Sequence, residues 1–166
     1  MIFLSSSIIK QINLMIVLQS NRFISIGDRI SLIRKITAQD VNDFAKLTGD
    51  INPIHLDSNY AKQTRYGKCI VHGTFIQGLL SCLLGVHFPG TGCVLHAINC
   101  KFPEPLFVDE TCRIEALVSK LRGRLATFDV NAYAYERNAV NFYFIFFTLF
   151  CAQDNKVNFE AVLYHI

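Results

Sequence analysis

The sequence lacks a large excess of charge of either sign. Its 166 residues include 16 lysines and arginines and 13 aspartates and glutamates, which gives a formal net charge of +3. The basic residues are scattered, whereas nucleic-acid-binding proteins gather theirs on one face, so no nucleic-acid partner is expected. Hydrophobic residues make up 51% of the chain, and this length suits one domain with a substantial core. A second domain is not expected.

Paired cysteine spacings are also missing. Several of the cysteines lie within apolar runs, which is typical of reduced, buried thiols in an intracellular protein. No two stand at the short spacing of a metal-binding pair, so neither a metal nor another cofactor is expected. The six positions are 69, 82, 93, 100, 112 and 151.

The N-terminal segment has no acidic residue up to position 27, and serines cluster at positions 5–7. No stretch within it is long and apolar enough to span a bilayer. This composition resembles a weak mitochondrial presequence, so we expect residues 1–25 to be a targeting segment and the protein to reside in the mitochondrial matrix. A secretory signal is the alternative, although Lys10 and Gln11 interrupt its apolar stretch.

The most informative motif is Gly-Asp-Ile-Asn-Pro-Ile-His at residues 49–55. Pro53 restricts its own backbone and that of Asn52, so Asp50 and His55 are joined by a defined bend. A carboxylate and an imidazole held in this way suit acid/base work on a bound water. An ordinary turn is the alternative, because Gly, Asp, Asn and Pro all favour turns.

A second motif, Ile-Val-His-Gly at residues 70–73, precedes apolar residues at helical spacing. We expect a buried helix to begin at His72 and Gly73 and to run to about residue 87. The first backbone amides of a helix are unpaired and carry partial positive charge, and a glycine there allows a ligand oxygen to approach closely. Such a helix end can polarise a carbonyl group.

Together these motifs resemble the signature of the MaoC-like, or hydratase 2, family of (R)-specific enoyl-thioester hydratases. The similar segments occur in the family's order and extend over roughly residues 26–136, with a further match near the C-terminus. The resemblance implies an α+β hot-dog fold, in which a curved antiparallel sheet wraps around one long helix. The segments that carry it are residues 44–57, 70–73, 83–85, 88–92 and 101–110.

The resemblance also implies roles for individual residues. Asp50 and His55 match the catalytic pair, and the backbone amide of Gly73 matches the group that binds the thioester carbonyl. Ser81 matches a serine that the family keeps in the central helix near the pair, although it could simply bond to its own helix. Asn52 is expected to brace the turn beside the substrate site. His72 is equally well read as a helix-start residue or as a substrate contact.

The function implied is that of a 3-hydroxyacyl-thioester dehydratase or (R)-specific enoyl-CoA hydratase, a hydro-lyase of mitochondrial fatty-acid synthesis. Its substrate would be a thioester of coenzyme A or acyl carrier protein, and the family resemblance implies a homodimer. Lys62, Arg65 and Lys68 could meet the carrier, or they could form an ordinary solvated face. A hot-dog acyl thioesterase and a non-catalytic acyl-thioester-binding module are the alternative functions.

The remaining pattern predicts strands and one further helix within a domain of residues 26–166. The helix ends at Thr48, and the strands lie at residues 28–35, 93–102, 111–120, 125–135 and 157–164.

Between residues 138 and 153 no residue is charged, and 142–150 is apolar except for one threonine. A fully buried strand could have this composition, but the resemblance expects only a tight hairpin there. We hypothesise that residues 140–153 are an intron translated in frame, because valine codons begin with GT and CAG encodes glutamine.

Overall fold

The computed structural model describes residues 15–16, 24–137 and 139–151. Its centre is one antiparallel sheet in the order β1-β2-β4-β5-β6-β3. The strands are β1 (Met15–Ile16), β2 (Arg29–Lys35), β3 (Cys93–Lys101), β4 (Thr111–Arg122), β5 (Leu125–Ala134) and β6 (Ala139–Cys151). In β4 and β5 alternate residues are buried, because successive side chains of a strand point to opposite faces of the sheet.

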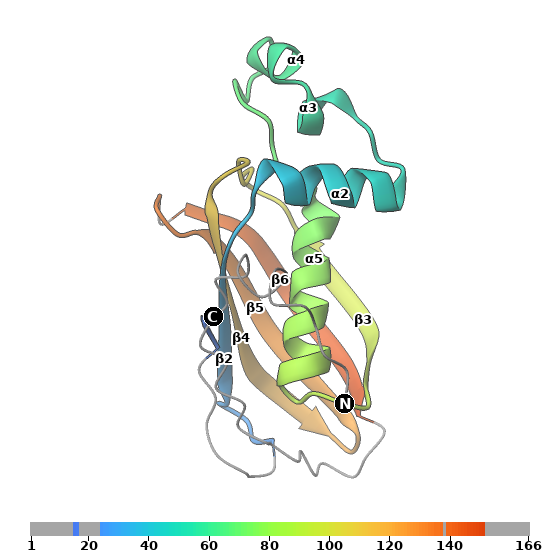
Figure 1. Ribbon diagram of the computed structural model, residues 1–166. Coiled ribbons are helices and arrows are strands. Elements are labelled where there is room, and N and C mark those ends of the chain that lie inside the picture. Colours follow the sequence, from blue (N-terminus) through green and yellow to red (C-terminus); the bar gives the residue numbers. More distant parts are fainter. Residues whose placement is uncertain (1–14, 17–23, 138, 152–166) are drawn as a thin grey trace.

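A long central helix lies along one face of this sheet (Figure 1). It consists of α5 (Gly73–Cys82), which continues as a π-helical turn, η1 (Leu83–His87). Its apolar residues pack on the buried residues of β4 and β5, and full burial of a leucine side chain contributes about 1.5–3 kcal/mol. The buried residues that the central helix contributes to this core are Ile76, Leu79, Leu80, Leu83 and Leu84.

Helix α2 (Ala38–Thr48) crosses the start of α5, and the short helices α3 (Pro53–Leu56) and α4 (Ser58–Lys62) lie beyond it (Figure 1). A capping box between Thr37 and Asp40 begins α2, and Gly49 ends it in a left-handed conformation with φ of 78°. The two caps define where α2 begins and where the chain leaves it. No helix within the described ranges has the length and apolar character needed to cross a membrane.

The hot-dog architecture expected from the sequence is therefore confirmed, as are the helix that ends at Thr48 and the strands near residues 28, 93, 111 and 125. A tight turn follows β5, and residues 140–151 of the hypothesised intron lie within the sheet. They form most of β6, which pairs with β5 on one side and β3 on the other. The strand predicted at residues 157–164 lies outside the described residues.

Candidate active site

Asp50 lies in the short connection between α2 and α3. The left-handed Gly49 turns the chain, and Asp50 Oδ1 then accepts a hydrogen bond of 3.3 Å from the Asn52 amide. The Asn52 side chain caps α3 by accepting from the Ile54 amide at 3.2 Å, and Pro53 occupies the first position of that helix. Asn52 thus braces the turn, as the sequence predicted, and is not among the residues that line the cavity described below.

His55 is oriented by the main chain of a distant segment. Its Nδ1 atom lies 2.7 Å from the Ile70 carbonyl oxygen, which can only accept, so Nδ1 carries the proton. The ring atom left for chemistry is Nε2. Burial lowers the pKa of His55 and the neighbouring His72 lowers it further, while the bond to Ile70 and the charge of Asp50 act in the opposite direction.

His72 completes the group. Its ring stacks on that of His55 with centroids 3.8 Å apart, and its Nε2 lies 3.0 Å from the Asp50 carbonyl oxygen and 3.9 Å from Asp50 Oδ2. One ligand-type atom from each of Asp50, His55 and His72 lies within 4.8 Å of the others. The sequence left the role of His72 open, and the structure brings it into the site.

Gly73 follows directly, at the start of α5. No side chain caps this helix end, so the first amides face the site without a capping oxygen. A Cβ atom at Gly73 would lie 2.8 Å from Cε1 of Phe102, so only glycine allows the Phe102 ring its present position. Gly73 therefore combines a backbone amide at an uncapped helix end with a position at which a side chain would meet Phe102.

Asp50, His55, His72 and Gly73 line one cavity of about 370 Å³, which we call the inner cavity. Its other walls come from the segments around residues 65 and 70 and from the loop after β3. That loop belongs to the segment 101–110, which carries part of the family resemblance. These walls comprise Arg65, Tyr66, Ile70, Val71, Thr74, Phe102, Pro103, Glu104, Pro105 and Leu106.

Ser81 is not brought to this group. It lies eight residues after Gly73 on the same helix, roughly 12 Å along the axis at about 1.5 Å per residue. Its side chain is exposed, and it does not line the inner cavity. Within this chain Asp50, His55 and Gly73 therefore form a site together, without Ser81.

A carboxylate and two imidazoles also raise the question of a metal. Hydrogen bonds already use Nδ1 of His55 and Nε2 of His72, and Nδ1 of His72 is buried without a partner. Of these three side chains, the Asp50 carboxylate and His55 Nε2 remain as donors for a metal. A catalytic zinc site uses three protein ligands, so this arrangement suits a water molecule better than a metal.

Comparison with known proteins gives consistent results. Residues 26–138 match the family described as MaoC like domain. The chain is 37% identical over 100 residues to a 3-hydroxybutyryl-CoA dehydratase of Methylorubrum extorquens, covering 57% of this chain and 64% of that protein. It is 35% identical over 103 residues to an (R)-specific enoyl-CoA hydratase of Aeromonas caviae, covering 62% of this chain and 77% of that protein.

A mitochondrial relative and a solved structure extend the comparison. The chain is 32% identical over 84 residues to the mitochondrial 3-hydroxyacyl-acyl-carrier-protein dehydratase FERN of Solanum lycopersicum, covering 51% of each protein. The solved (R)-hydratase from A. caviae superposes with a TM-score of 0.73 at 29% identity, covering 77% of this chain and 97% of that one. The matched region thus spans about half to three quarters of these curated relatives.

Proposed function

Because the chain belongs to the MaoC-like domain family, we propose that it is a hydro-lyase that adds water reversibly to trans-2-enoyl thioesters to form (3R)-3-hydroxyacyl thioesters. The observation that carries this proposal is the inner cavity, where Asp50 and His55 face the uncapped start of α5. The names of the matched relatives, which are hydratases and dehydratases, support it.

In this mechanism Asp50 accepts a proton from a water molecule while the water oxygen bonds to C3 of the substrate. His55 orients that water by accepting a hydrogen bond at its unprotonated Nε2. The proton removed from the water is then passed from Asp50 through Nε2 to C2, so that Asp50 and His55 return to their starting states and one hydrogen and one hydroxyl are added in total. Negative charge develops on the thioester oxygen, and the Gly73 amide stabilises it. Removing single donors from comparable sites costs about 2.7–4 kcal/mol. Reversal of these steps is dehydration.

The test is hydration of crotonyl-CoA, followed at the enoyl absorbance, with the wild type and His55→Ala. We expect turnover by the wild type and a loss on the order of 10² or more in the variant, within the range of general acid/base groups. His87→Ala is the control, because His87 is the last residue of η1 and does not line the inner cavity. Equal activity of wild type and His55→Ala would contradict the assignment.

The two alternative functions give different results in the same assay. A thioesterase would release free coenzyme A, which a thiol reagent detects. A non-catalytic binding module would bind the thioester without consuming it. We expect loss of enoyl absorbance without thiol release.

We propose that the carrier of the acyl chain is coenzyme A or acyl carrier protein. Of the three basic residues named above, Arg65 lines the inner cavity, where its side chain lies over the Tyr66 ring and donates to the Tyr66 hydroxyl at 2.7 Å. Lys62 and Lys68 are exposed nearby. Arg65→Ala is expected to raise KM for crotonyl-CoA while kcat changes little, and an unchanged KM would favour a solvated face.

We also propose a homodimer joined through β3. This strand is one edge of the sheet, yet it exposes large apolar side chains, with Val94 61% and Leu95 44% exposed. An open apolar edge tends to pair with another strand, and a second copy would cover it. Light scattering at micromolar concentration should give a dimer, and Ile98→Lys should weaken it. A monomeric wild type would contradict the proposal.

We propose the mitochondrial matrix, and fatty-acid synthesis there, as the setting. The mitochondrial names of the tomato and Arabidopsis relatives support this, although other relatives are bacterial. Most of residues 1–25 lie outside the described residues. A fusion of residues 1–25 to a fluorescent protein should enter mitochondria, and a cytosolic or secreted fusion would contradict the targeting role.

We retain the proposal that residues 140–153 are a translated intron. Their place in β6 then requires another strand between β5 and β3 in the spliced protein. Residues 157–164 can supply it, since Val157 and Phe159 alternate with polar residues. A variant lacking residues 140–153 should fold and be active. Mature transcripts that all contain these codons would end the proposal.

A further inference from the structure

His72 does not behave as a helix-capping residue. It stands at the N-cap position of α5 but makes no capping hydrogen bond, and its side chain is 1% exposed. The ring lies between His55 and the Phe44 ring of α2, whose centroid is 5.1 Å away. Burial of a polar ring costs free energy unless the ring forms hydrogen bonds, and His72 does not form one to the amides of α5. Its burial therefore needs another explanation.

The hydrogen bond of His72 supplies that explanation. Its Nε2 atom lies 3.0 Å from the Asp50 carbonyl oxygen, and since a carbonyl can only accept, Nε2 is the protonated nitrogen. The buried Nδ1 has no hydrogen-bond partner. The bond joins the start of α5 to the main chain of a residue that is itself 50% exposed.

Asp50 has few other restraints on its position. Its carboxylate accepts a bond of 3.3 Å from the Asn52 amide, and its own amide donates to the Thr48 hydroxyl at 3.3 Å. Both bonds are local to the turn, so they do not fix the turn against α5 or the Gly73 amide. The bond from His72 does, because His72 and Gly73 are adjacent in the chain.

We infer that His72 is a positioning residue, which holds the Asp50 main chain through Nε2–H and the His55 ring by stacking. This inference rests on the proposed function, in which Asp50 and His55 must share one water. Displacement of a reacting group by about 1 Å can cost 10²-fold in rate, so such a support affects kcat although it touches no substrate.

The experiment compares His72→Gln with His72→Asn. The glutamine side-chain nitrogen is as many bonds from the backbone as Nε2 and can replace the donor, whereas the shorter asparagine reaches only the position of Nδ1. We expect kcat of His72→Asn to fall about tenfold, equal to about 1.4 kcal/mol, and His72→Gln to retain most of the activity, with KM little changed in both. His72→Phe keeps a stacked ring without the donor and should resemble His72→Asn.

A pH profile separates this role from simple folding support. Among the described residues, the titratable and charged groups that line the inner cavity with His55 are Asp50, Arg65, Tyr66, His72 and Glu104. Since His72 lowers the pKa of His55, both amide variants should move the acidic limb of kcat/KM to higher pH. A merely structural role would change the midpoint of thermal unfolding but neither the limb nor kcat per folded molecule.

Two results would overturn the inference. One is equal kcat in the glutamine and asparagine variants, whether both are active or both impaired, when circular dichroism shows that they are folded. The other is an acidic limb unchanged from the wild type. Failure of the proposed function is a separate outcome, in which the wild type does not hydrate crotonyl-CoA or His55→Ala keeps full activity, whatever the His72 variants do.

Discussion

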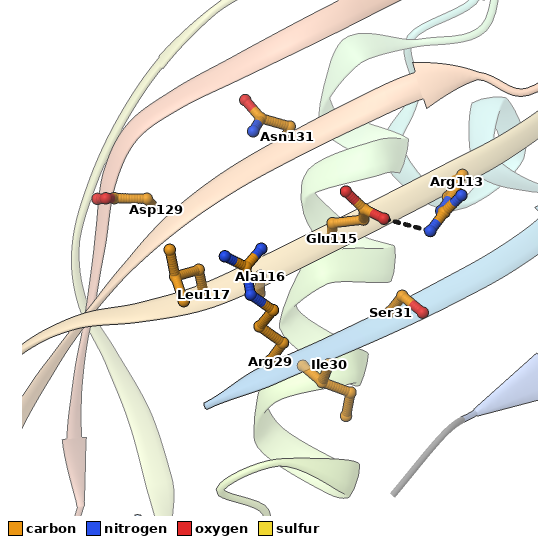
Figure 2. Close-up of a pocket in the computed structure, with 9 residues that line it drawn as sticks. All are labelled: Arg29, Ile30, Ser31, Arg113, Glu115, Ala116, Leu117, Asp129 and Asn131. Atoms are coloured by element: carbon orange, nitrogen blue, oxygen red, sulfur yellow. Dashed lines mark ion pairs between the residues drawn. The ribbon is translucent and has the colours of Figure 1, made fainter. Parts of the chain in front are cut away.

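Two pockets, one on the sheet and one at the start of α5, differ in the partners of their polar side chains. The outer pocket, of about 270 Å³, lies on the face turned away from α5 and includes Arg29, Arg113, Glu115, Asp129 and Asn131 (Figure 2). There Arg113 forms an ion pair with Glu115. Asp129 accepts a hydrogen bond of 2.9 Å from the Ser119 hydroxyl. Arg113, Glu115 and Asp129 of this pocket therefore interact with side chains of β4 or β5.

In the inner cavity the two histidines have backbone partners. His55 and His72 each donate to a main-chain carbonyl, and this leaves His55 Nε2 and the Asp50 carboxylate open to a ligand. Side chains that satisfy one another have little capacity for chemistry, whereas groups oriented by the backbone keep a reactive atom free. Polar residues alone thus do not mark a site.

The largest difference is expected from the same substitution in each pocket. Asp50→Asn removes the proton acceptor and should lower kcat/KM for crotonyl-CoA on the order of 10² or more. Asp129→Asn loses a charge on the outer face and should stay within about twofold of the wild type, since surface charge interactions are weak. Equal losses in the two variants would remove the distinction between the pockets.

Gly73→Ala tests the helix end of the inner cavity. The new Cβ atom would lie 2.8 Å from the Phe102 ring, which must move within the cavity wall. We expect kcat/KM to fall on the order of 10-fold, a typical result of small misplacement at a reacting centre. Gly78→Ala in the same helix meets no atom within 4 Å. That control should keep its activity and gain about 0.5–1 kcal/mol of stability.

The pH dependence tests the state of His55. Burial is the main reason that its pKa is lowered, so the neutral ring persists to more acidic pH than a free imidazole, whose pKa is about 6.5. If the neutral ring is the active form, the acidic limb of kcat/KM lies below that value and activity is lost only as pH falls through it. A limb above about 6.5 would show that His55 is not the titrating group.

Glu115→Gln in the outer pocket should have the smallest effect. It breaks the ion pair with Arg113, but both side chains are partly exposed, so the free energy of unfolding should fall by about 0–1 kcal/mol. Denaturant unfolding measures this change, and crotonyl-CoA hydration should be unaffected. A large loss of activity would reveal a role for the outer pocket that its charge pairing does not suggest.

The features that could be predicted from the sequence are local ones. Asp50 and His55 are five positions apart across a proline turn, so their proximity needs no long-range contact. The capping pair of Thr37 and Asp40 and the alternation along β4 and β5 likewise arise within short segments. Gly73 was identified because a helix start is recognisable from the apolar pattern that follows it.

Other features depend on packing between distant segments. His72 meets Asp50 and Phe44 only because α2 crosses the start of α5, and nothing in the Ile-Val-His-Gly motif specifies that crossing. Ser81 shares the central helix but lies too far along it to reach the pair. Residues 139–151 pair with both β5 and β3, and the apolar run by itself did not specify these neighbours.

The order of residues along the chain was thus enough to establish the family, the hot-dog fold and the acid–imidazole pair, since each depends on local pattern or on motifs in series. The place of His72 in the site, the size of the inner cavity and the hydrogen-bond partners of the His55 and His72 rings were decided by the tertiary structure. Hydrogen bonds and stacking act over a few ångströms in space, and they join residues whose separation in sequence carries no signal of the contact.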